Sequence, residues 1–408
     1  MPEEAINATL GLEGLEVLGI ARFEHLIEVI VESRFDAGSC HRCGGIAAEP
    51  KERPEVFVRD LSMSGRPVVL RWRKRRWRCT YCSKTWTESH PQVPPRARMT
   101  LRFKEHLATR AAAQGNFSKV ALSERVSYDT VARAHKERAD LVRKLRPRLA
   151  PKVISIDEAS VRRGFNYNTV VTDVLARYVI GTIPGRRQDA LVRWFADLDE
   201  EVREGIEVVI MDMARFYRAS INRILPHAVV VVDKFHVIRA ANYALDRVRG
   251  RLQGRKPRST GGWPRRLFRC RFALLRSTDN LRDQDRSSLT AVFDVFPEMG
   301  QAQRLKEGLR EVFESADRTE AALALEIWFQ HVKRADLPEF NSLAKMIGWW
   351  REELLNHFTY RMTNAYAEGI TNRIKVIKRQ AYGVPNIANF EDRILVQCGM
   401  PKDQRIPA

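Results

Sequence analysis

The amino-acid sequence predicts an α/β protein made of several consecutive modules, and three features carry that expectation. Two C-x2-C cysteine pairs lie near the N-terminus, in stretches rich in valine, isoleucine and tryptophan, which favour strands. Three short helical segments with capping residues follow. The middle of the chain then alternates apolar, strand-like runs with helical ones, which is the pattern of an α/β domain.

The composition indicates a folded, strongly basic protein. Lysine and arginine number 70 against 50 acidic residues, so the formal net charge is +20. Hydrophobic residues make up 44% of the chain, enough for a packed core, which excludes wholesale disorder. At roughly 150 residues per domain, 408 residues predict about two or three domains. The positive charge predicts affinity for polyanions such as nucleic acid.

Several classes of protein are disfavoured. No run approaches the roughly 18 consecutive apolar residues of a transmembrane helix, so we expect no membrane partner. The first residues, MPEEAINATLGLEGLEVLG, lack the basic start of a signal peptide. Six cysteines are too few for a disulfide scaffold of this size. The sequence therefore predicts a reducing, intracellular setting.

The two cysteine pairs predict a zinc ribbon. Each C-x2-C step lets two thiolates of one tight turn reach the same tetrahedral zinc ion. The long spacing between the pairs leaves room for strands that separate two knuckles. Redox-active or coincidental pairs are the alternative, but two such pairs close together favour one structural zinc. The expected ligands are Cys40, Cys43, Cys79 and Cys82.

A basic run, Arg71–Arg78, lies between the two knuckles. Six of its eight residues are cationic, and two tryptophans are interleaved with them. Guanidinium groups pair with phosphates and indoles stack on bases, so this run is a candidate DNA contact. The alternative is a solvated edge strand whose charges oppose aggregation. The candidate DNA-binding residues are Arg71, Arg73, Lys74, Arg75, Arg76 and Arg78.

The three capped segments predict a helix-turn-helix. Thr100 can cap a first helix that ends at Gly115, and Phe117–Arg125 indicates a short second helix. Ser127 opens a third helix that runs to about Arg143. A plain helical linker would give a similar pattern. In a helix-turn-helix, the residues facing the major groove or its phosphates would be Tyr128, Thr130, Arg133 and Lys136.

The middle of the chain follows the order strand, two-strand hairpin, helix, strand, helix, strand. The strands are expected at residues 152–156, 169–174, 178–183, 206–211 and 228–232. This is the order of a ribonuclease H-like fold, in which the first and fourth strands lie side by side.

Aspartates follow three of these apolar strands, at Asp157, Asp212 and Asp233. A single aspartate after a strand is usually a turn or cap residue. Carboxylates that converge at the ends of neighbouring strands repel one another and are reconciled by shared divalent cations. Two such cations serve in-line displacement at phosphorus. Because the strand before Asp212 should neighbour the first strand, we expect Asp212 to partner Asp157.

A third carboxylate is expected from a late helix. Ile370, Ile374 and Ile377 recur at helical spacing and predict one apolar face. Glu368 and Lys375 lie on the other face, where a metal beside a DNA phosphate would suit them. The alternative is a solvated face with helix ion pairs.

More than 130 residues separate Asp233 from Glu368, too many for a loop. The sequence predicts a helical insertion there, interrupted by the basic stretch Gly254–Pro264. Its tryptophans are expected either to pack in the helical core or to stack on an unpaired base. They are Trp263, Trp328, Trp349 and Trp350.

Together these motifs resemble a DDE transposase of bacterial insertion sequences. The resemblance rests on the cysteine pairs, the helix-turn-helix and the stretches SIDEAS, VIMDM, VVVDKFH and NAYAEGITNRIKVIKRQAYG. More narrowly, the chain is similar to the family with an N-terminal zinc-binding region, distantly related to Mutator-like transposases. The resemblance implies that Asp157, Asp212 and Glu368 form the catalytic triad. It also implies that Asp233 and His236 match an auxiliary D-x2-H element, and that Lys375 echoes a carboxylate–lysine helix pattern.

The resemblance also implies a function. Such an enzyme binds the terminal inverted repeats of its element, cuts the ends and joins them to target DNA. It would use two Mg²⁺ ions, with Mn²⁺ as a substitute, and one structural Zn²⁺. We expect a homodimer or higher oligomer on DNA, in the bacterial cytoplasm with the nucleoid. The alternatives are a ribonuclease H-like nuclease or resolvase, and a transposase-derived regulator without catalysis.

The expected domain organisation follows from these motifs. A zinc-ribbon region at residues 1–95 precedes a helix-turn-helix at 96–150. The ribonuclease H-like core begins at 151–240, is interrupted by the helical insertion at 241–355, and resumes at 356–408 with the third acidic residue.

Overall fold

The computed structural model describes residues 10–34, 37–146, 150–160, 167–254, 262–361, 365–382 and 386–401. The basic stretch Gly254–Pro264 therefore lies mostly outside the described residues. The chain divides into two compact units. The first holds Met1–Arg146 with Ile377–Gln397 and Gln404–Ala408, and the second holds Pro147–Val376 with Cys398–Asp403.

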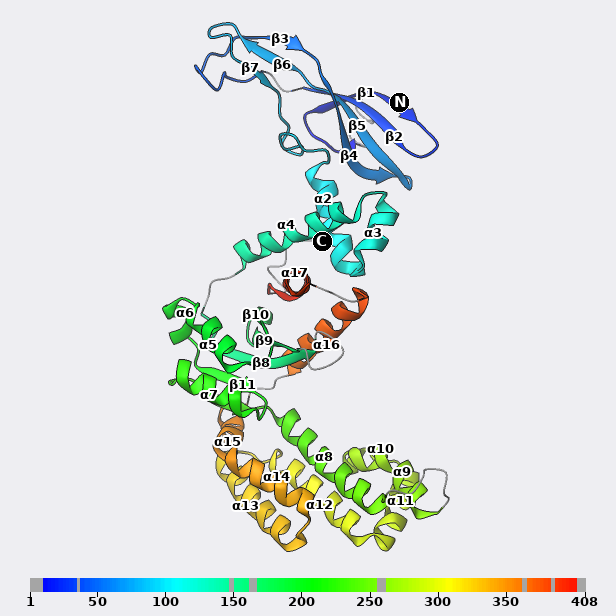
Figure 1. Ribbon diagram of the computed structural model, residues 1–408, viewed down its shortest axis with the longest axis vertical. Coiled ribbons are helices and arrows are strands. Elements are labelled where there is room, and N and C mark those ends of the chain that lie inside the picture. Colours follow the sequence, from blue (N-terminus) through cyan, green and yellow to red (C-terminus); the bar gives the residue numbers. More distant parts are fainter. Residues whose placement is uncertain are drawn as a thin grey trace. The chain divides into compact units, whose positions relative to one another are not determined.

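The first unit begins with a four-stranded sheet (Figure 1). Its strands are β1 (Leu15–Arg22), β2 (Ile27–Ser33), β4 (Glu55–Met63) and β5 (Arg66–Arg73), in the order β1-β2-β5-β4. Strands β2 and β5 are parallel and the other pairs are antiparallel. Burial alternates along β2 and β5, because one face of the sheet packs on an apolar core.

A smaller sheet carries the cysteines. Its strands are β3 (Ala48–Glu52), β6 (Arg76–Cys79) and β7 (Thr85–Thr87), with β6 in the centre. The basic run Arg71–Arg78 is therefore not one strand. Its first half ends β5 and its second half forms β6, so the two halves belong to different sheets.

Three helices complete this part of the unit, as the sequence predicted. They are α2 (Leu101–Gln114), α3 (Phe117–Glu124) and α4 (Tyr128–Leu145). The side chains of Thr100 and Ser127 cap the first and third helices, each accepting a hydrogen bond from a backbone N–H three residues later. Gly115 ends α2 at φ 67°, a conformation that favours glycine.

Helix α17 (Ile387–Cys398) has most of its residues in this first unit. Arg393 is buried, donates to the carbonyl of Gly115, and places its guanidinium 3.7 Å from the ring centroid of Phe117. Asp392 forms an ion pair with Arg143. The sequence predicted that residues 356–408 belong to the catalytic core, whereas these contacts group Ile377–Gln397 with the helix-turn-helix.

The second unit is built on a five-stranded sheet in the order β10-β9-β8-β11-β12. The strands are β8 (Val153–Ser160), β9 (Tyr167–Asp173), β10 (Tyr178–Pro184), β11 (Val208–Met211) and β12 (Val229–Val232). Strands β8, β11 and β12 are parallel, β9 runs antiparallel to β8, and β10 runs antiparallel to β9. The prediction that the first and fourth strands pair is confirmed.

Helices cover this sheet. On one face, Ile154 and Ile156 of β8 pack with α5 (Gln188–Ala196) and α7 (Arg215–Ile224). The short helix α6 (Glu200–Glu204) leads into β11. Residues of opposite parity, such as Val153, form a separate cluster on the other face.

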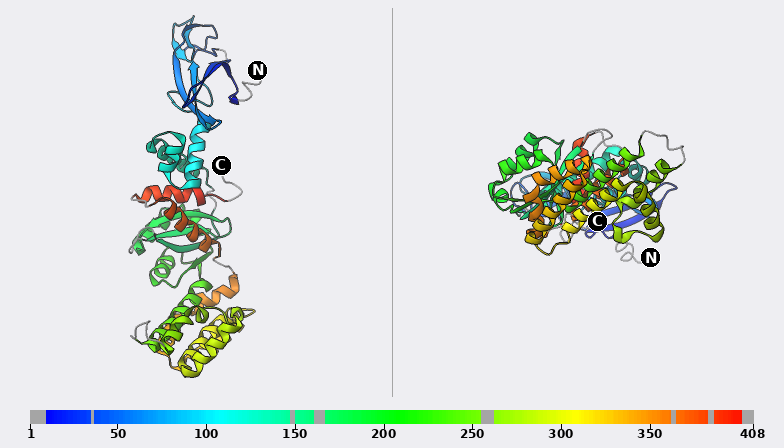
Figure 2. Two further views of the ribbon diagram at one scale, coloured as in Figure 1. Left: turned by 90° about the vertical axis from the view of Figure 1, so that its right-hand side faces the viewer. Right: turned by 90° about the horizontal axis from the view of Figure 1, so that it is seen from below.

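The expected helical insertion follows β12. It comprises α8 (Lys234–Gln253), α9 (Trp263–Arg269), α10 (Arg271–Leu275), the 3-10 turn η1 (Thr278–Asn280), α11 (Asp283–Val295), α12 (Pro297–Val312), α13 (Arg318–Ala335), α14 (Pro338–Trp349) and α15 (Arg351–Tyr360). Figures 1 and 2 show α9–α14 gathered around the later part of α8. Helix α16 (Ala365–Gln380) then returns to the sheet. No helix in the described part of the chain is long and apolar enough to cross a membrane.

Candidate functional site

The four predicted zinc ligands lie together. The sulfur atoms of Cys40, Cys43, Cys79 and Cys82 are all within 4.8 Å of one another. Across the two knuckles, the Sγ atoms of Cys40 and Cys82 are 3.6 Å apart, as are those of Cys43 and Cys79. Sulfurs bound at about 2.3 Å to a tetrahedral zinc would be roughly 3.8 Å apart, so the arrangement fits that ion.

The backbone of the first knuckle favours the thiolate form of Cys40, whereas neighbouring thiols raise the pKa of Cys43. Backbone N–H groups of Arg42 and Cys43 point at the Cys40 sulfur and are the main cause that lowers its pKa to about 6. Gly44, at φ 72°, makes the turn. A Cβ at Gly45 would lie 2.5 Å from the Tyr81 ring, so any other residue there would require that exposed ring to move.

The basic run is largely paired within its own unit. Arg71 binds Glu55 and Glu28, and Arg73 lies near Glu32 and Glu55. Arg75 donates to the buried carboxylate of Glu88, Arg76 pairs with Glu52, and Arg78 reaches the hydroxyl of Ser83. Trp72 is 1% exposed and therefore packs in the core. The predicted DNA contacts of these arginines would require the existing ion pairs to give way.

The third helix of the helix-turn-helix presents the predicted polar residues. Arg133 and Lys136 are exposed, and Tyr128 is 49% exposed. Arg133 and Lys136 lie on the side away from the buried residues Val131 and Ala134. Tyr128 instead lies on the buried side at the start of the helix, with its ring centroid 6.0 Å from that of Phe117. The hydroxyl of Thr130 is 2.8 Å from that of Ser127, so this side chain belongs to the helix cap.

The register of the five-stranded sheet aligns the three aspartates. Ile156 pairs with Met211, and Met211 pairs with Val232. The residues that follow are Asp157, Asp212 and Asp233, so all three occupy one level of the sheet. Neighbouring strands lie about 4.8 Å apart, which places Asp212 one strand from Asp157 and Asp233 two strands away.

Two details differ from the sequence expectation for Asp157. Strand β8 continues to Ser160 because β9 pairs with it along that length, so Asp157 lies inside the strand rather than after it. Its carboxylate is also held on both sides. One oxygen accepts from the backbone N–H of Glu158 at 2.7 Å, and the other accepts from the hydroxyl of Thr371 at 2.7 Å.

Thr371 connects α16 to the sheet, and no residue of the predicted site pointed to it. It is buried on α16, one turn after Glu368, so the two side chains lie on neighbouring positions of one helix face. Its spacing of three residues from Glu368, on one helix face, was the sequence signal that could have identified it. Glu368 itself is exposed, and Lys375 donates to Asn372 at 3.2 Å. Among the described residues, the four cysteines are the one set of three or more Cys, His, Asp or Glu side chains close enough to hold a metal ion, so Asp157, Asp212 and Glu368 are not brought together in that way.

The Asp212 side chain is half-buried, and its carboxyl is incompletely satisfied. One of its oxygens has no hydrogen-bond partner among the described residues. Burial is the largest cause that raises its pKa to about 6; His236 opposes this rise, while Glu158 and Asp157 add to it. A buried carboxylate oxygen without a donor suits a divalent cation, whose preferred ligands are such oxygens.

Asp233 has a structural role in the fold. Its side chain caps α8 by accepting from the N–H of Phe235 at 3.2 Å. The Nε2 atom of His236 lies 3.8 Å from its other oxygen. His236 therefore interacts electrostatically with both Asp233 and Asp212.

The tryptophans of the insertion divide into two groups. Trp328 and Trp350 are at most 2% exposed, so they pack in the core. Trp263 is partly buried and lies against Phe296. Trp349 is 50% exposed, with the guanidinium of Arg215 3.8 Å from its ring centroid. Only Trp349, among these four, keeps a largely open side chain.

These features together define a DNA-processing enzyme of the DDE class. The chain belongs to the ISL3 family of transposases, because a family described as "Transposase" matches residues 154–394. The helix-turn-helix domain of transposase family ISL3 matches residues 88–139. The zinc-finger of transposase IS204/IS1001/IS1096/IS1165 matches residues 36–82.

Named relatives agree with this family. The chain is 26% identical over 350 residues to the transposase for insertion sequence element IS1001 of Bordetella parapertussis, which covers 84% of each chain. It is 28% identical over 250 residues to the transposase for insertion sequence element IS1557 of Mycobacterium tuberculosis, which covers 56% of each. The predicted enzyme class and the DNA partner are confirmed. The zinc-finger match and the cysteine cluster support a structural zinc.

Proposed function

We propose that this transposase binds the terminal inverted repeats of its insertion sequence, cleaves the DNA ends and joins them to target DNA. The observation that carries the proposal is the register of the parallel strands, which sets Asp157 and Asp212 side by side beneath α16. Such an edge suits phosphoryl transfer, because two adjacent carboxylates can share divalent cations.

The chain's own residues would prepare this edge. Asp157 and Asp212 would hold Mg²⁺, or Mn²⁺ in its place, with Glu368 completing the set. Two divalent ions bound there would supply activation of an attacking oxygen and stabilisation of the leaving one. Thr371 fixes the orientation of the Asp157 carboxylate, and His236 favours the ionised form of Asp212. Water would attack during cutting, and a DNA 3′-hydroxyl would attack during strand transfer.

End recognition would come from the first unit. The exposed side chains of α4 would enter the major groove, as the third helix of such a motif does. The zinc ribbon would add contacts beside it. Two ends must be processed together, so we propose a homodimer or higher oligomer on DNA. We also propose a cytoplasmic, nucleoid-associated location and the five-part domain organisation given above, with residues 377–397 moved to the helix-turn-helix.

A gel assay with labelled end-bearing DNA and Mg²⁺ tests this function. Joined products are expected from a transposase. Cleaved products without joining would favour a nuclease or resolvase. Bound but intact DNA would favour a regulator without catalysis, and would contradict the proposal.

We expect the affinity of the site for a divalent cation to fall as the pH drops below about 6, the pKa of Asp212. Below this pH, a proton competes with the cation for that carboxylate, and each further pH unit should weaken binding by up to about tenfold. Above it, Asp212 is ionised and affinity should level off. Calorimetric titration of Mn²⁺ into the full chain at a series of pH values measures this. Affinity that stays constant from about pH 8 to about pH 5 would contradict the prediction.

A further inference from the structure

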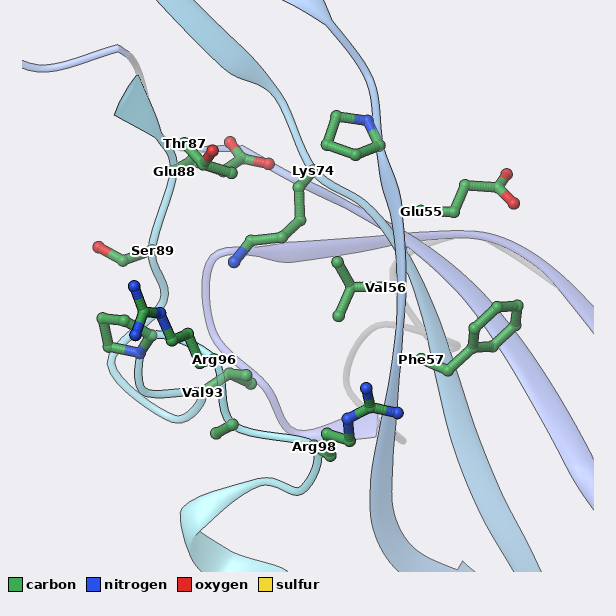
Figure 3. Close-up of a pocket in the computed structure, with 13 residues that line it drawn as sticks. Glu55, Val56, Phe57, Lys74, Thr87, Glu88, Ser89, Val93, Arg96 and Arg98 are labelled. Carbon is green, nitrogen blue, oxygen red and sulfur yellow. The ribbon is translucent and has the colours of Figure 1, made fainter. Parts of the chain in front are cut away.

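The first unit contains a cleft of about 680 Å³ that no motif predicted. Strand β4 and Lys74 form one wall, and the segment from Thr87 to Arg98 forms the other. Figure 3 shows the Lys74 side chain extending into the cleft, with Arg96 and Arg98 on the facing segment.

The facing segment is tied down by backbone hydrogen bonds. The N–H of Arg59, in β4, donates to the carbonyl of Arg98, and the N–H of Thr100 donates back to Arg59, both at 2.9 Å. The N–H of Ala97 donates to Pro94 at 3.0 Å. Because the segment extends the edge of β4, Arg98 has a fixed backbone rather than a loose loop position.

The charges in the cleft do not cancel. Its two carboxylates, Glu55 and Glu88, are already bound by arginines of the basic run. By contrast, no ion pair within 4.0 Å joins Lys74, Arg96 or Arg98 to any residue that the structure describes, although the Glu88 carboxylate acts on Lys74 from further away. Three cations therefore line a recess whose acidic groups are neutralised from outside it.

The ammonium group of Lys74 is partly desolvated in the folded chain. Its ammonium lies 4.3 Å from the ring centroid of Trp72, and burial lowers its pKa, with Glu88 only partly offsetting the effect. A partly desolvated cation without an ion pair gains most from a bound anion.

We propose that this cleft binds the phosphodiester backbone of the element-end DNA, through Lys74, Arg96 and Arg98. The inference deepens the proposed function, on which it rests for the identity of the ligand. It also assigns the DNA-backbone contact of the first unit to cations that are not ion-paired, in place of the ion-paired arginines of the basic run. Since such contacts carry no sequence information, the cleft would set the register of the protein on DNA.

The test compares two double variants of the full chain. Arg96→Gln with Arg98→Gln removes two cations of the cleft; Arg73→Gln with Arg76→Gln removes two paired, exposed cations of the same unit. Arg96 has a φ of 65°, and glutamine, which is also long and unbranched at Cβ, should add little strain there. Binding to end-bearing duplex is measured over a salt series without divalent cations, so that catalysis plays no part.

The cleft variant should flatten the dependence of log affinity on log salt concentration by about 0.9 for each phosphate that is no longer neutralised, or about two units in all. The control pair should change the slope by much less. Lysine at both cleft positions should restore the slope, because the charge rather than the shape is required. Equal slopes for wild type and cleft variant, or an equally flattened slope in the control pair, would overturn the inference.

A second measurement locates the contact. Single neutral methylphosphonate substitutions along the duplex should weaken wild-type binding at particular positions, and the cleft variant should be insensitive at those same positions. If no position shows this difference, the proposal fails. If the wild-type protein joins ends normally but the salt slopes of wild type and cleft variant are equal, the cleft proposal alone is refuted. If the slopes differ but the wild-type protein never cuts DNA, only the proposed reaction is refuted.

Discussion

Replacing Asp212 with asparagine should abolish both cleavage and strand transfer while leaving DNA binding intact. The substitution keeps the size of the side chain and removes the charge that a divalent cation requires. Asp212 is half-buried one strand from Asp157, and one of its carboxylate oxygens is buried without a donor among the described residues. Loss of such a ligand should slow the reaction by about a thousandfold or more, which corresponds to about 4 kcal/mol. Mg²⁺-dependent cleavage of end-bearing DNA, measured beside binding of the same DNA, checks both halves of the prediction.

Asp233→Asn is the matched control. It makes the same chemical change at the same level of the sheet, but one strand further from Asp157. Asparagine can still accept the hydrogen bond that caps α8, so the fold should survive. Activity should fall less than in Asp212→Asn, and His236→Ala should have a comparable effect. A nearly normal Asp212→Asn enzyme beside an inactive Asp233→Asn enzyme would overturn the assignment.

Features that depend on local chemistry could be predicted from the sequence. The caps Thr100 and Ser127 fixed the starts of two helices because a cap needs only the next few residues. The strand order of the catalytic sheet was also predictable, since parallel strands joined through helices allow few connections. The same order brought Asp212 to the level of Asp157.

Features that depend on distant partners could not be predicted. The basic run suggested free charges, but Glu28, Glu52, Glu55 and Glu88 come from other strands and loops, and their pairing follows from the packing of the sheets. The role of Thr371 depends on its hydrogen bond to Asp157, which forms only when α16 packs beside β8. The placement of α17 depends on Arg393, whose contacts with Gly115 and Phe117 span most of the chain.

Replacing Cys79 and Cys82 with serine should abolish stoichiometric zinc and weaken binding to element ends. The pair supplies half of a four-sulfur cluster, and a serine hydroxyl is a poor substitute for a thiolate ligand. The small sheet of β3, β6 and β7 is short and lacks a large core of its own among the described residues. Metal binding should therefore contribute much of its folding free energy. Zinc content measured by mass spectrometry, with end binding measured in parallel, gives the two readouts; we expect at least a tenfold loss of affinity, or about 1.4 kcal/mol.

The matched control changes two cysteines that lie outside the cluster, Cys270 and Cys398. Both are buried in the described structure and neither belongs to the four-sulfur group. Serine at these positions should cost some stability but retain one zinc per chain and normal end binding. This comparison separates loss of the metal from a general effect of removing thiols. If the Cys79/Cys82 variant keeps its zinc, these two cysteines are not the zinc ligands. If it loses zinc and still binds ends like wild type, then the ribbon does not contribute to recognition, and the helix-turn-helix must supply the specific contacts alone.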